Sequence, residues 1–537
     1  MRIDAEDIIK KFDYVDLIKI KDRYKIHNFI SGMILDVNKI TAFIASSLDG
    51  GTYGELKIKI EKKLGKEYIN EEDIKITLEN LFNLKLINIT KRESYPKILL
   101  INPCYEYQNE VYGKLRLTPP LGILSIGSVL HEKGYNVHLL DMLVEKLRPN
   151  ELKGHIEKIK PDIVGISMNF TSTANVCYQI ARELKDLSIE TVFVGGNHAT
   201  FTYEEVLEDK NIDYVIRFQG EETVLELIEI LTTKNLEKLS SCKGIAYKRN
   251  GIIEVTERRA LESDYLNKLP QIAWHLLPMN KYEKDSRWIL YTSQGCPCAC
   301  TFCSTSAFNN SSRVITMSVD NVIKRIKHVI KLWSEKSIPV IGFCDDAFTH
   351  DRKRVTELCE RIIRENLKFN WSCSTRVDLV DENLIDLMYR AGCRAMLFGI
   401  ESCSNKVLQA VGKRINLEQS KRAIEIAKKR GMSIREMFIL GLPYESHESL
   451  QLMEEFFIET KPHEIRFGLL SVYPGTPLWN HSEKFKINIL TRDWGKYDLL
   501  KPTSNNTLLN EKELYEKYIE FTEKYEKKVA NNDFKII

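Results

Sequence analysis

The chain contains no long apolar run. Its first residues, MRIDAEDIIKKFDYVDL, interleave acids with apolar side chains and lack the uninterrupted core of a signal peptide, and no later stretch is long enough to span a bilayer. An excess of one charge is also missing, because 78 Lys and Arg face 75 Asp and Glu, a formal net charge of +3. Such a balance provides no broad attraction for nucleic acid or an anionic membrane. We therefore expect a cytoplasmic protein with neither of these partners.

Most of the twelve cysteines lie in apolar, strand-like segments such as GFCDDAF and WSCSTRVDL, where a buried reduced thiol is the ordinary interpretation. The exception is CPCACTFC, which sets Cys296, Cys300 and Cys303 at a CxxxCxxC spacing with Cys298 inside the loop. Three thiolates on a short loop can bind three irons of a 4Fe–4S cluster and leave the fourth iron open. A structural zinc loop is the alternative, but tetrahedral zinc needs a fourth ligand, and Cys298 lies too close to its neighbours for easy chelation.

The length and the alternation of elements predict an α/β protein of roughly three domains. Residues 1–94 read as strands followed by three helical patterns, which predicts a winged-helix-like α+β module. Residues 95–245 alternate strand and helix and predict a Rossmann-like, doubly wound parallel sheet. A charged, irregular linker is expected at 246–287, a partial (β/α)6 barrel at 288–480 and a helical C-terminal extension at 481–537.

Ligands of parallel sheets bind beyond the carboxyl ends of the strands. In the doubly wound domain the strand-end candidates are Pro119, Pro120, Leu121, Gly122, Ser167, Met168, Asn169, Gly195, Gly196, His198, Gly220, Glu221 and Glu222. In the barrel the cysteine loop follows the first strand, and the later strands supply Asp345, Asp346, Arg376, Glu401 and Arg435. Taken singly, each of these residues has an ordinary alternative: a glycine that ends a strand, a surface histidine or a solvated charge.

The cysteine motif, with Phe302 before its last cysteine, resembles the signature of radical S-adenosylmethionine (SAM) enzymes. In that family the open iron chelates the amino and carboxylate groups of SAM, and an electron from the cluster cleaves SAM to a 5'-deoxyadenosyl radical. The resemblance implies a 4Fe–4S cluster, SAM and a flavodoxin- or ferredoxin-like electron donor. By the same resemblance the residues expected near SAM are Phe302, Asp345, Asp346, Arg376, Glu401, Arg435 and Tyr473.

The segments TPPLGILSIGSVL, VGISMN, VFVGGNHAT and GEETVLELI together resemble the cobalamin-binding domain that precedes the barrel in one class of radical SAM enzymes. The strand-end candidates of the doubly wound domain would then contact cobalamin. A DxHxxG motif is missing, as is normal in that class, where cobalamin binds with its own base displaced. No cysteine follows Cys403, so cobalamin rather than an auxiliary cluster is the expected second cofactor. The most common chemistry of the class is methyl transfer to a carbon radical, which consumes two SAM molecules.

The order of strands and helices in residues 1–94 resembles the peptide-recognition element similar to the pyrroloquinoline quinone biosynthesis protein D. In that family a leader peptide adds as a strand to the sheet edge, which implies that the substrate is a ribosomally made precursor peptide. Together with the methyl transfer implied by the cobalamin-type resemblance, the expected reaction is C-methylation of that peptide. One alternative is a radical enzyme that cyclises, epimerises or cross-links a peptide, or rearranges a small molecule. Another is an iron–sulfur redox sensor whose winged module binds DNA. The acidic third helix, with Glu71, Glu72, Asp73 and Glu79, argues against DNA.

Overall fold

The computed structural model describes residues 95–105, 117–283, 288–309, 314–333, 337–461 and 463–526 and, towards the amino terminus, residues 8–11, 15–20, 23–28, 34–37, 41, 44–45, 47–64, 71–83 and 87–90. Contacts divide the chain into two compact units. One comprises Met1–Ile98 with Val129–His138, and the other Leu99–Ser128 with Leu139–Ile537.

The N-terminal module combines two small sheets with two described helices. Strands β2 (Val15–Ile20), β3 (Arg23–Asn28) and β4 (Ile34–Val37) form an antiparallel sheet, and β5 (Asp49–Thr52), β1 (Ile8–Lys11) and β6 (Ile87–Thr90) form the other. Helices α2 (Tyr53–Leu64) and α3 (Glu71–Asn83) follow β5 in the chain. The expected third helix ends earlier than predicted, because the β-branched residues after it pair with β1. Within the first helical pattern, at 40–48, the described residues Thr41, Ile44 and Ala45 are helical.

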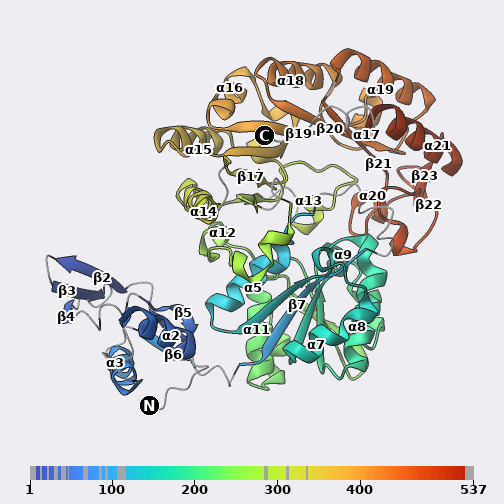
Figure 1. Ribbon diagram of the computed structural model, residues 1–537. Helices are drawn as coiled ribbons and strands as arrows, with labels where there is room; N and C mark the ends of the chain where they lie inside the picture. The colour runs from blue at the N-terminus through green and yellow to red at the C-terminus, as the bar shows by residue number, and fades with distance from the viewer. Residues whose placement is uncertain are drawn as a thin grey trace. The chain divides into compact units, whose positions relative to one another are not determined.

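The doubly wound domain is a seven-stranded sheet in the order β13-β12-β11-β10-β9-β7-β8. Its first five strands along the chain are β7 (Lys97–Asn102), β8 (Asn136–Asp141), β9 (Ile163–Ser167), β10 (Thr191–Gly195) and β11 (Tyr214–Ile216). Helices α5 (Leu121–Glu132) and α11 (Glu221–Thr232) cover one face, and α7 (Lys153–Ile159) and α8 (Ala174–Asp186) the other (Figure 1). The strand order reverses between β7 and β9, so the ligand crevice of this fold lies at their carboxyl ends.

The expected linker, 246–287, begins with regular structure and not with an irregular segment. Strands β12 (Ile245–Arg249) and β13 (Ile252–Val255) form an antiparallel hairpin, and β12 extends the sheet by pairing with β11. The turn is Asn250-Gly251, with φ of 53° and 80°, and this dipeptide is the preferred centre of a two-residue hairpin because both positions need positive φ.

The barrel is a six-stranded sheet in the order β14-β17-β18-β19-β20-β21, and every neighbouring pair is parallel. The strands are β14 (Ile289–Leu290), β17 (Val340–Phe343), β18 (Asn370–Thr375), β19 (Cys393–Glu401), β20 (Ser433–Leu440) and β21 (Glu464–Leu469). They alternate with helices α14 (Val319–Leu332), α15 (Arg352–Arg364), α16 (Glu382–Arg390), α18 (Leu417–Lys429) and α19 (His447–Thr460) (Figure 1). The predicted α/β class and partial barrel are confirmed.

The C-terminal extension contacts both the barrel and the doubly wound domain. Helix α21 (Glu511–Phe521) packs on β21, as a brace for the end of the barrel. Before it, β22 (Ile487–Ile489) and β23 (Ser504–Asn506) form a hairpin. Between them Trp494 and Tyr497 enter the hydrophobic core of the doubly wound domain, which the prediction of a helical tail missed. No helix in the described parts of the chain is both long and apolar enough to cross a membrane.

Candidate active site

The cysteine loop leaves the barrel directly after its first strand. Short strands β15 (Ser293–Gln294) and β16 (Ile315–Thr316) pair on either side of it. The loop is also held by two backbone bonds, from Thr301 N to Val411 O at 2.9 Å and from Leu478 N to Thr301 O at 3.1 Å. The side chains of Cys296 and Cys300 each lie close enough to Cys303 for their charges to interact.

These three thiols fit a 4Fe–4S cluster better than a single ion. Among the described residues, no group of three His, Cys, Asp or Glu is spaced to hold one metal ion. A cluster instead places each thiolate on a different iron. Burial raises the pKa of Cys296 to about 12, so the free thiol is neutral and its deprotonation depends on a bound metal charge.

A buried charged group lies beside Cys300. Glu401, the last residue of β19, has a φ of 71° at a register shift in the ladder. Its Oε1 lies 2.8 Å from Lys413 Nζ, and Arg376 Nη2 donates to the Lys413 carbonyl at 2.7 Å. Burial raises the pKa of Cys300, while the charges of Lys413 and Arg376 oppose that rise. Arg376 also pairs with Asp378 at 2.9 Å, so each of the two cations already has one carboxylate. The group therefore places two ion pairs beside Cys300, and a SAM carboxylate there would bind to cations that are already partly neutralised.

Lys413 was not predicted from the sequence. It lies in the loop after α17 (Asn405–Ala410), well beyond the carboxyl end of β19, where the predicted residues lie. Its signal was weak: a lysine after Gly412, which has a φ of 68° and so marks a tight turn. Arg376 and Glu401, which were predicted, are brought together with it and stay the candidates for SAM.

The two predicted aspartates after β17 have different surroundings. The Asp345 carboxylate is buried and accepts from Thr292 N at 2.7 Å, from Thr292 Oγ1 at 2.6 Å and from Ser293 Oγ at 2.5 Å. Asp346 accepts from Gly295 N at 2.9 Å and from Thr305 Oγ1 at 3.1 Å, at the two ends of the cysteine loop. Asp345 therefore secures β14, and Asp346 remains the carboxylate available to a ligand at the loop.

Arg435 lies away from the other residues predicted to contact SAM. It stands near the amino-terminal end of β20, and its Nη2 pairs with Glu464 Oε2 at 2.8 Å, at the start of β21. Parallel strands place this end opposite the cysteine loop. Phe302 packs on an apolar cluster with Val407 and Leu478. Tyr473 packs on the core of the doubly wound domain, so adenine contacts of Phe302 and Tyr473 stay predictions.

At the crevice of the doubly wound domain, two predicted loops close on each other. Met168 N donates to Gly195 O at 2.7 Å, and Asn197 N donates to Asn169 Oδ1 at 3.1 Å. Gly196 has a φ of 120°, and a Cβ there would lie 2.7 Å from Asn169 Cα. Pro119 and Pro120 lead into α5, which begins with Leu121 and Gly122, and a Cβ on Gly122 would meet no described atom within 4 Å.

Replacing Gly196 with alanine should lower both stability and cobalamin uptake. The backbone conformation is strained for alanine, and the methyl group would collide with the backbone of Asn169, so we expect a loss of about 2–3 kcal/mol in the free energy of unfolding. The control is Gly251→Ala, where φ is 80° but no atom lies within 4 Å, and the expected cost is only about 1 kcal/mol. Urea unfolding and bound cobalt per chain measure both effects. Equal losses in the two variants would show that the closeness of the two loops is not what matters.

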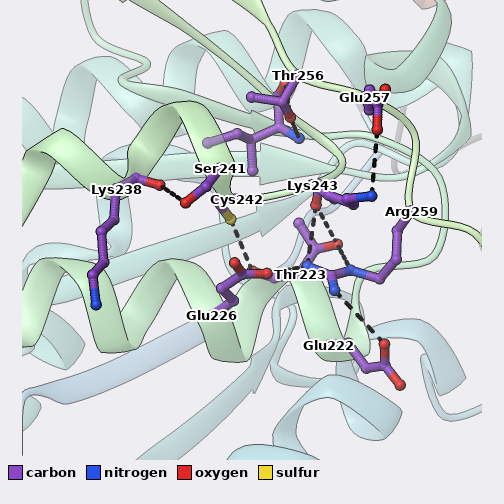
Figure 2. Close-up of polar contacts among 11 residues, drawn as sticks. Glu222, Thr223, Glu226, Lys238, Ser241, Cys242, Lys243, Thr256, Glu257 and Arg259 are labelled. Atoms are coloured by element: carbon purple, nitrogen blue, oxygen red, sulfur yellow. Dashed lines mark hydrogen bonds and ion pairs between the residues drawn. The ribbon is translucent and has the colours of Figure 1, made fainter.

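Three of the predicted cobalamin residues have their side chains engaged inside the protein. Glu221 accepts from Ser125 Oγ at 2.8 Å and from Tyr265 OH at 2.5 Å. Glu222 pairs with Arg259 at 3.8 Å (Figure 2). His198 is buried with Nδ1 3.2 Å from Thr171 Oγ1 and its ring 5.0 Å from Trp494. Burial lowers the pKa of His198 to about 4, so it is a neutral core histidine. All three side chains thus have protein partners, whereas His198 Nε2 is buried with no partner among the described residues. Their contact with cobalamin stays a prediction.

The crevice loops touch the segment that follows the cysteine loop. Asn197 Nδ2 donates to Ser304 Oγ at 2.7 Å, and Gln219 Nε2 donates to Asn309 Oδ1 at 2.8 Å. The other amide atoms, Asn197 Oδ1 and Gln219 Oε1, are buried and have no partner among the described residues. Such atoms require a partner, and a corrin ring edged with amide groups supplies donors of that kind. Asn197 lies within the predicted strand-end loop 195–200, whereas Gln219 was not predicted, because it gains its role only through a contact between distant segments.

Two buried glutamates of the barrel were also missed. Glu436 lies on β20 and Glu445 in the loop after it, and both are fully buried. Neither Glu436 oxygen has a partner among the described residues, whereas Glu445 Oε2 accepts from Gly441 N at 2.5 Å. Burial raises the pKa of each to about 8. Both therefore carry a proton at neutral pH.

Glu436→Gln should remove a pH dependence of stability. Below about pH 4.5 Glu436 is protonated in both the folded and the unfolded chain, so it has no effect. Between there and about pH 8 only the unfolded chain ionises, so the free energy of unfolding falls as pH rises. Glutamine cannot ionise, and we expect the variant to be more stable by roughly 3 kcal/mol at pH 8 and equal at pH 4.5. Urea unfolding at both pH values tests this, with Glu425→Gln on the exposed side of α18 as the control. A difference in the free energy of unfolding between Glu436→Gln and the wild type that is the same at both pH values would contradict it.

Known proteins match both halves of this site. The B12 binding domain family matches residues 116–228, and the Radical SAM superfamily matches residues 290–457. The "Uncharacterized methyltransferase PH0819" of Pyrococcus horikoshii is 35% identical over 412 residues, which cover 76% of this chain and 87% of the relative. The anaerobic magnesium-protoporphyrin IX monomethyl ester cyclase of Rubrivivax gelatinosus is 27% identical and covers 78% of this chain and 76% of its own length. The cytidylyl-2-hydroxyethylphosphonate methyltransferase of Streptomyces wedmorensis is 28% identical and covers 72% and 80%.

Solved structures share the fold. The cobalamin-dependent SAM radical enzyme OxsB, with aqua-cobalamin and SAM bound, superposes with a TM-score of 0.64 at 18% identity, over 93% of this chain and 74% of that one. The radical SAM methyltransferase TsrM from Kitasatospora setae, with cobalamin and a [4Fe-4S] cluster bound, superposes with a TM-score of 0.61 at 17% identity. The match covers 74% of this chain and 78% of that one. With the cysteine loop and the adjoining crevice, these matches confirm the predicted 4Fe–4S cluster, SAM and cobalamin. The chain is a radical SAM enzyme and belongs to the cobalamin-dependent radical SAM methyltransferase family.

Proposed function

We propose that this enzyme methylates an unactivated carbon of a ribosomally made precursor peptide. The observation that carries the methyl transfer is the pair of contacts Asn197–Ser304 and Gln219–Asn309, at 2.7 and 2.8 Å. They bring the crevice of the B12 domain to the residues just after Cys303. A methyl donor in the crevice and a radical source at the cysteine loop would then face one shared substrate position, which is the geometry that a transfer between them needs.

The bound cofactors supply a 5'-deoxyadenosyl radical and a methyl group; the chain's residues hold the reacting partners in place. Asp346 fixes the cysteine loop through Gly295 and Thr305. Lys413 and Arg376 would bind the anionic end of SAM, with Glu401 holding the lysine ammonium at 2.8 Å. Ser125, Glu221 and Tyr291 form a buried hydrogen-bonded chain between the B12 domain and the residue that follows the first barrel strand.

The peptide substrate is proposed from the N-terminal module. Its antiparallel sheet β2-β3-β4 ends in two edge strands, to which an extended peptide can add. Helix α3 carries Glu71, Glu72, Asp73 and Glu79, a composition that repels a nucleic-acid backbone. Binding of arrayed leader-like peptides to the full-length enzyme, beside a random DNA duplex at low and physiological salt, tests this. Salt-sensitive DNA binding without peptide binding would contradict it.

The methyl transfer is tested by anaerobic turnover of the holoenzyme with SAM, a flavodoxin- or ferredoxin-type reductant and candidate peptides. Each methylation should release one S-adenosylhomocysteine, from the methyl-donating SAM, and one 5'-deoxyadenosine with methionine, from the SAM that is reductively cleaved. Product mass should rise by one methylene unit. Formation of 5'-deoxyadenosine and a changed product without S-adenosylhomocysteine would rule out methyl transfer.

That second outcome defines the runner-up function. One relative that covers most of this chain carries the name of a cyclase rather than a methyltransferase. Its alignment favours a radical reaction in which no methyl group moves, such as ring closure, epimerisation or cross-linking. The ratio of S-adenosylhomocysteine to 5'-deoxyadenosine distinguishes the two functions, because only methyl transfer produces both compounds.

A further inference from the structure

Two arginines share one aromatic ring where the B12 domain meets the cysteine segment. The Arg217 guanidinium carbon lies 5.2 Å from the Phe218 ring centre, and that of Arg258 lies 3.8 Å from it. Arg217 also lies over the Tyr203 ring at 4.5 Å. Phe218 is held in a left-handed conformation, with a φ of 65° and its N–H donating to Thr200 Oγ1 at 2.9 Å. The stacked guanidinium groups are therefore fixed in position before any ligand binds.

The described residues supply no counter-charge to this pair. Neither arginine forms an ion pair with a described carboxylate, and Arg217 Nε is buried without a partner among the described residues. Burial lowers the pKa of both arginines, and the charge of Arg217 lowers that of Arg258 further. The two partly buried cations repel each other, and an anion that contacts both would relieve that repulsion.

The neighbouring arginine shows the opposite situation. Arg259 donates to Thr223 Oγ1 at 3.0 Å, pairs with Glu222 at 3.8 Å and also binds Glu226 (Figure 2). Arg259 thus pairs with two carboxylates, whereas Arg258, the preceding residue, has none among the residues that the structure describes. Arg258 donates instead to the carbonyl of Phe308.

The pair lies beside the segment that follows the cysteine loop. Phe308 belongs to α13 (Thr305–Phe308), which directly follows the cysteine loop, and its ring is 5.8 Å from that of Phe218. Gln219, which contacts Asn309, comes next to Phe218 in the chain. The SAM carboxylate already has Arg376 and Lys413 near Cys300, so this second pair of cations is not needed for it.

We propose that Arg217 and Arg258 bind an anionic oxygen group of the substrate, a carboxylate or a phosphate, and so position the carbon to be methylated. The inference rests on the proposed function and deepens it by naming a charged handle on the substrate. Arginine forks bind both kinds of oxyanion in a bidentate manner. In a peptide the group would be an acidic side chain or a carboxyl terminus; in a small molecule it would be a phosphate or carboxylate.

In the test, inorganic phosphate or acetate is titrated into the holoenzyme, loaded with cluster and cobalamin, and anion binding is measured by calorimetry. Arg217→Gln and Arg258→Gln should each weaken anion binding about 10- to 100-fold, the loss expected for a charge-assisted hydrogen bond. Arg258→Lys, which keeps the charge, should lose less. The matched control is Arg394→Gln: Arg394 also stacks on an aromatic ring, that of Tyr389 at 4.5 Å, but its donors bind backbone carbonyls. Cobalt per chain should be unchanged in every variant, which also shows that each has folded.

Three outcomes would overturn the proposal. The wild-type holoenzyme could bind neither anion, or Arg394→Gln could lose as much affinity as the two test variants. Cobalt content could also fall in step with anion affinity, and the pair would then belong to the phosphate of the cofactor's own nucleotide. Failure of the proposed function is a separate result, because it is measured by S-adenosylhomocysteine release and not by anion binding.

Discussion

Replacing Cys300 with alanine is expected to abolish the cluster and, with it, reductive cleavage of SAM. Cys300 is a buried residue of the cysteine loop and lies beside the Lys413–Glu401 pair. No neighbouring thiol can therefore take its place without moving the loop. Bound iron and sulfide should fall from a full 4Fe–4S complement to near zero, and 5'-deoxyadenosine should be undetectable. Anaerobic reconstitution followed by iron and sulfide analysis measures the first, and chromatography of the SAM products the second.

The matched control is Cys298→Ala in the same loop. Cys298 is also a free thiol, but it falls between the three spaced cysteines, and we expect its variant to retain the cluster and its activity. Bound cobalt should stay unchanged in both variants, because the crevice is built from the other domain. A cluster that survives in Cys300→Ala but is lost in Cys298→Ala would refute the assignment of ligands.

Lys413→Met is expected to destabilise the barrel by about 3–5 kcal/mol, since it would leave a buried carboxylate without its cation. Lys413 and Glu401 are both nearly inaccessible to solvent, and their charged atoms lie 2.8 Å apart. Burial acts to lower the pKa of Lys413, but the Glu401 carboxylate raises it above its ordinary value. The ammonium therefore stays charged in the folded protein, and methionine fills its volume without replacing its charge.

A double-mutant cycle separates the charge from the packing. Glu401→Gln removes the opposite charge, and we expect Lys413→Met combined with Glu401→Gln to be more stable than Lys413→Met alone, because no buried charge is then unpaired. Urea midpoints of cluster-free protein give the stabilities, and SAM binding to reconstituted protein gives the functional cost. Additive losses in the double variant would show that the pair does not interact.

The arrangement of strands and helices could be predicted because burial imposes it on the chain. Segments such as PKILLINP and IPVIGFCDDAF are apolar on both faces, as strands covered on both sides by helices must be, and the helices between them show the usual amphipathic spacing. The hairpin of β12 and β13 was not predicted, although the Asn250-Gly251 pair is a typical hairpin turn. The charged residues around that turn indicated a linker, but an edge hairpin with one exposed face tolerates such residues.

The candidate site divides in the same way. Loop cysteines and strand-end residues such as Asp346, Arg376 and Glu401 were accessible to prediction, since the carboxyl ends of parallel strands meet at one edge. Strand direction sets Arg435 apart from them, because it lies near the start of its strand and not at the carboxyl end. Residues whose partner comes from another domain, such as Gln219 with Asn309, gave no signal of their own.

The sequence by itself determined the local chemistry: the cysteine spacing, the order of the strands and the polar groups at their ends, all of which follow from short-range pattern and burial. Only the tertiary structure decided which of those groups are free for ligands. Glu221 is bound by Ser125 and Tyr265, Arg259 is neutralised by its neighbouring glutamates, and Arg258 is left without a carboxylate among the described residues. The reason is physical: the state of a charge depends on which distant segments fold against it, and no spacing along the chain records that.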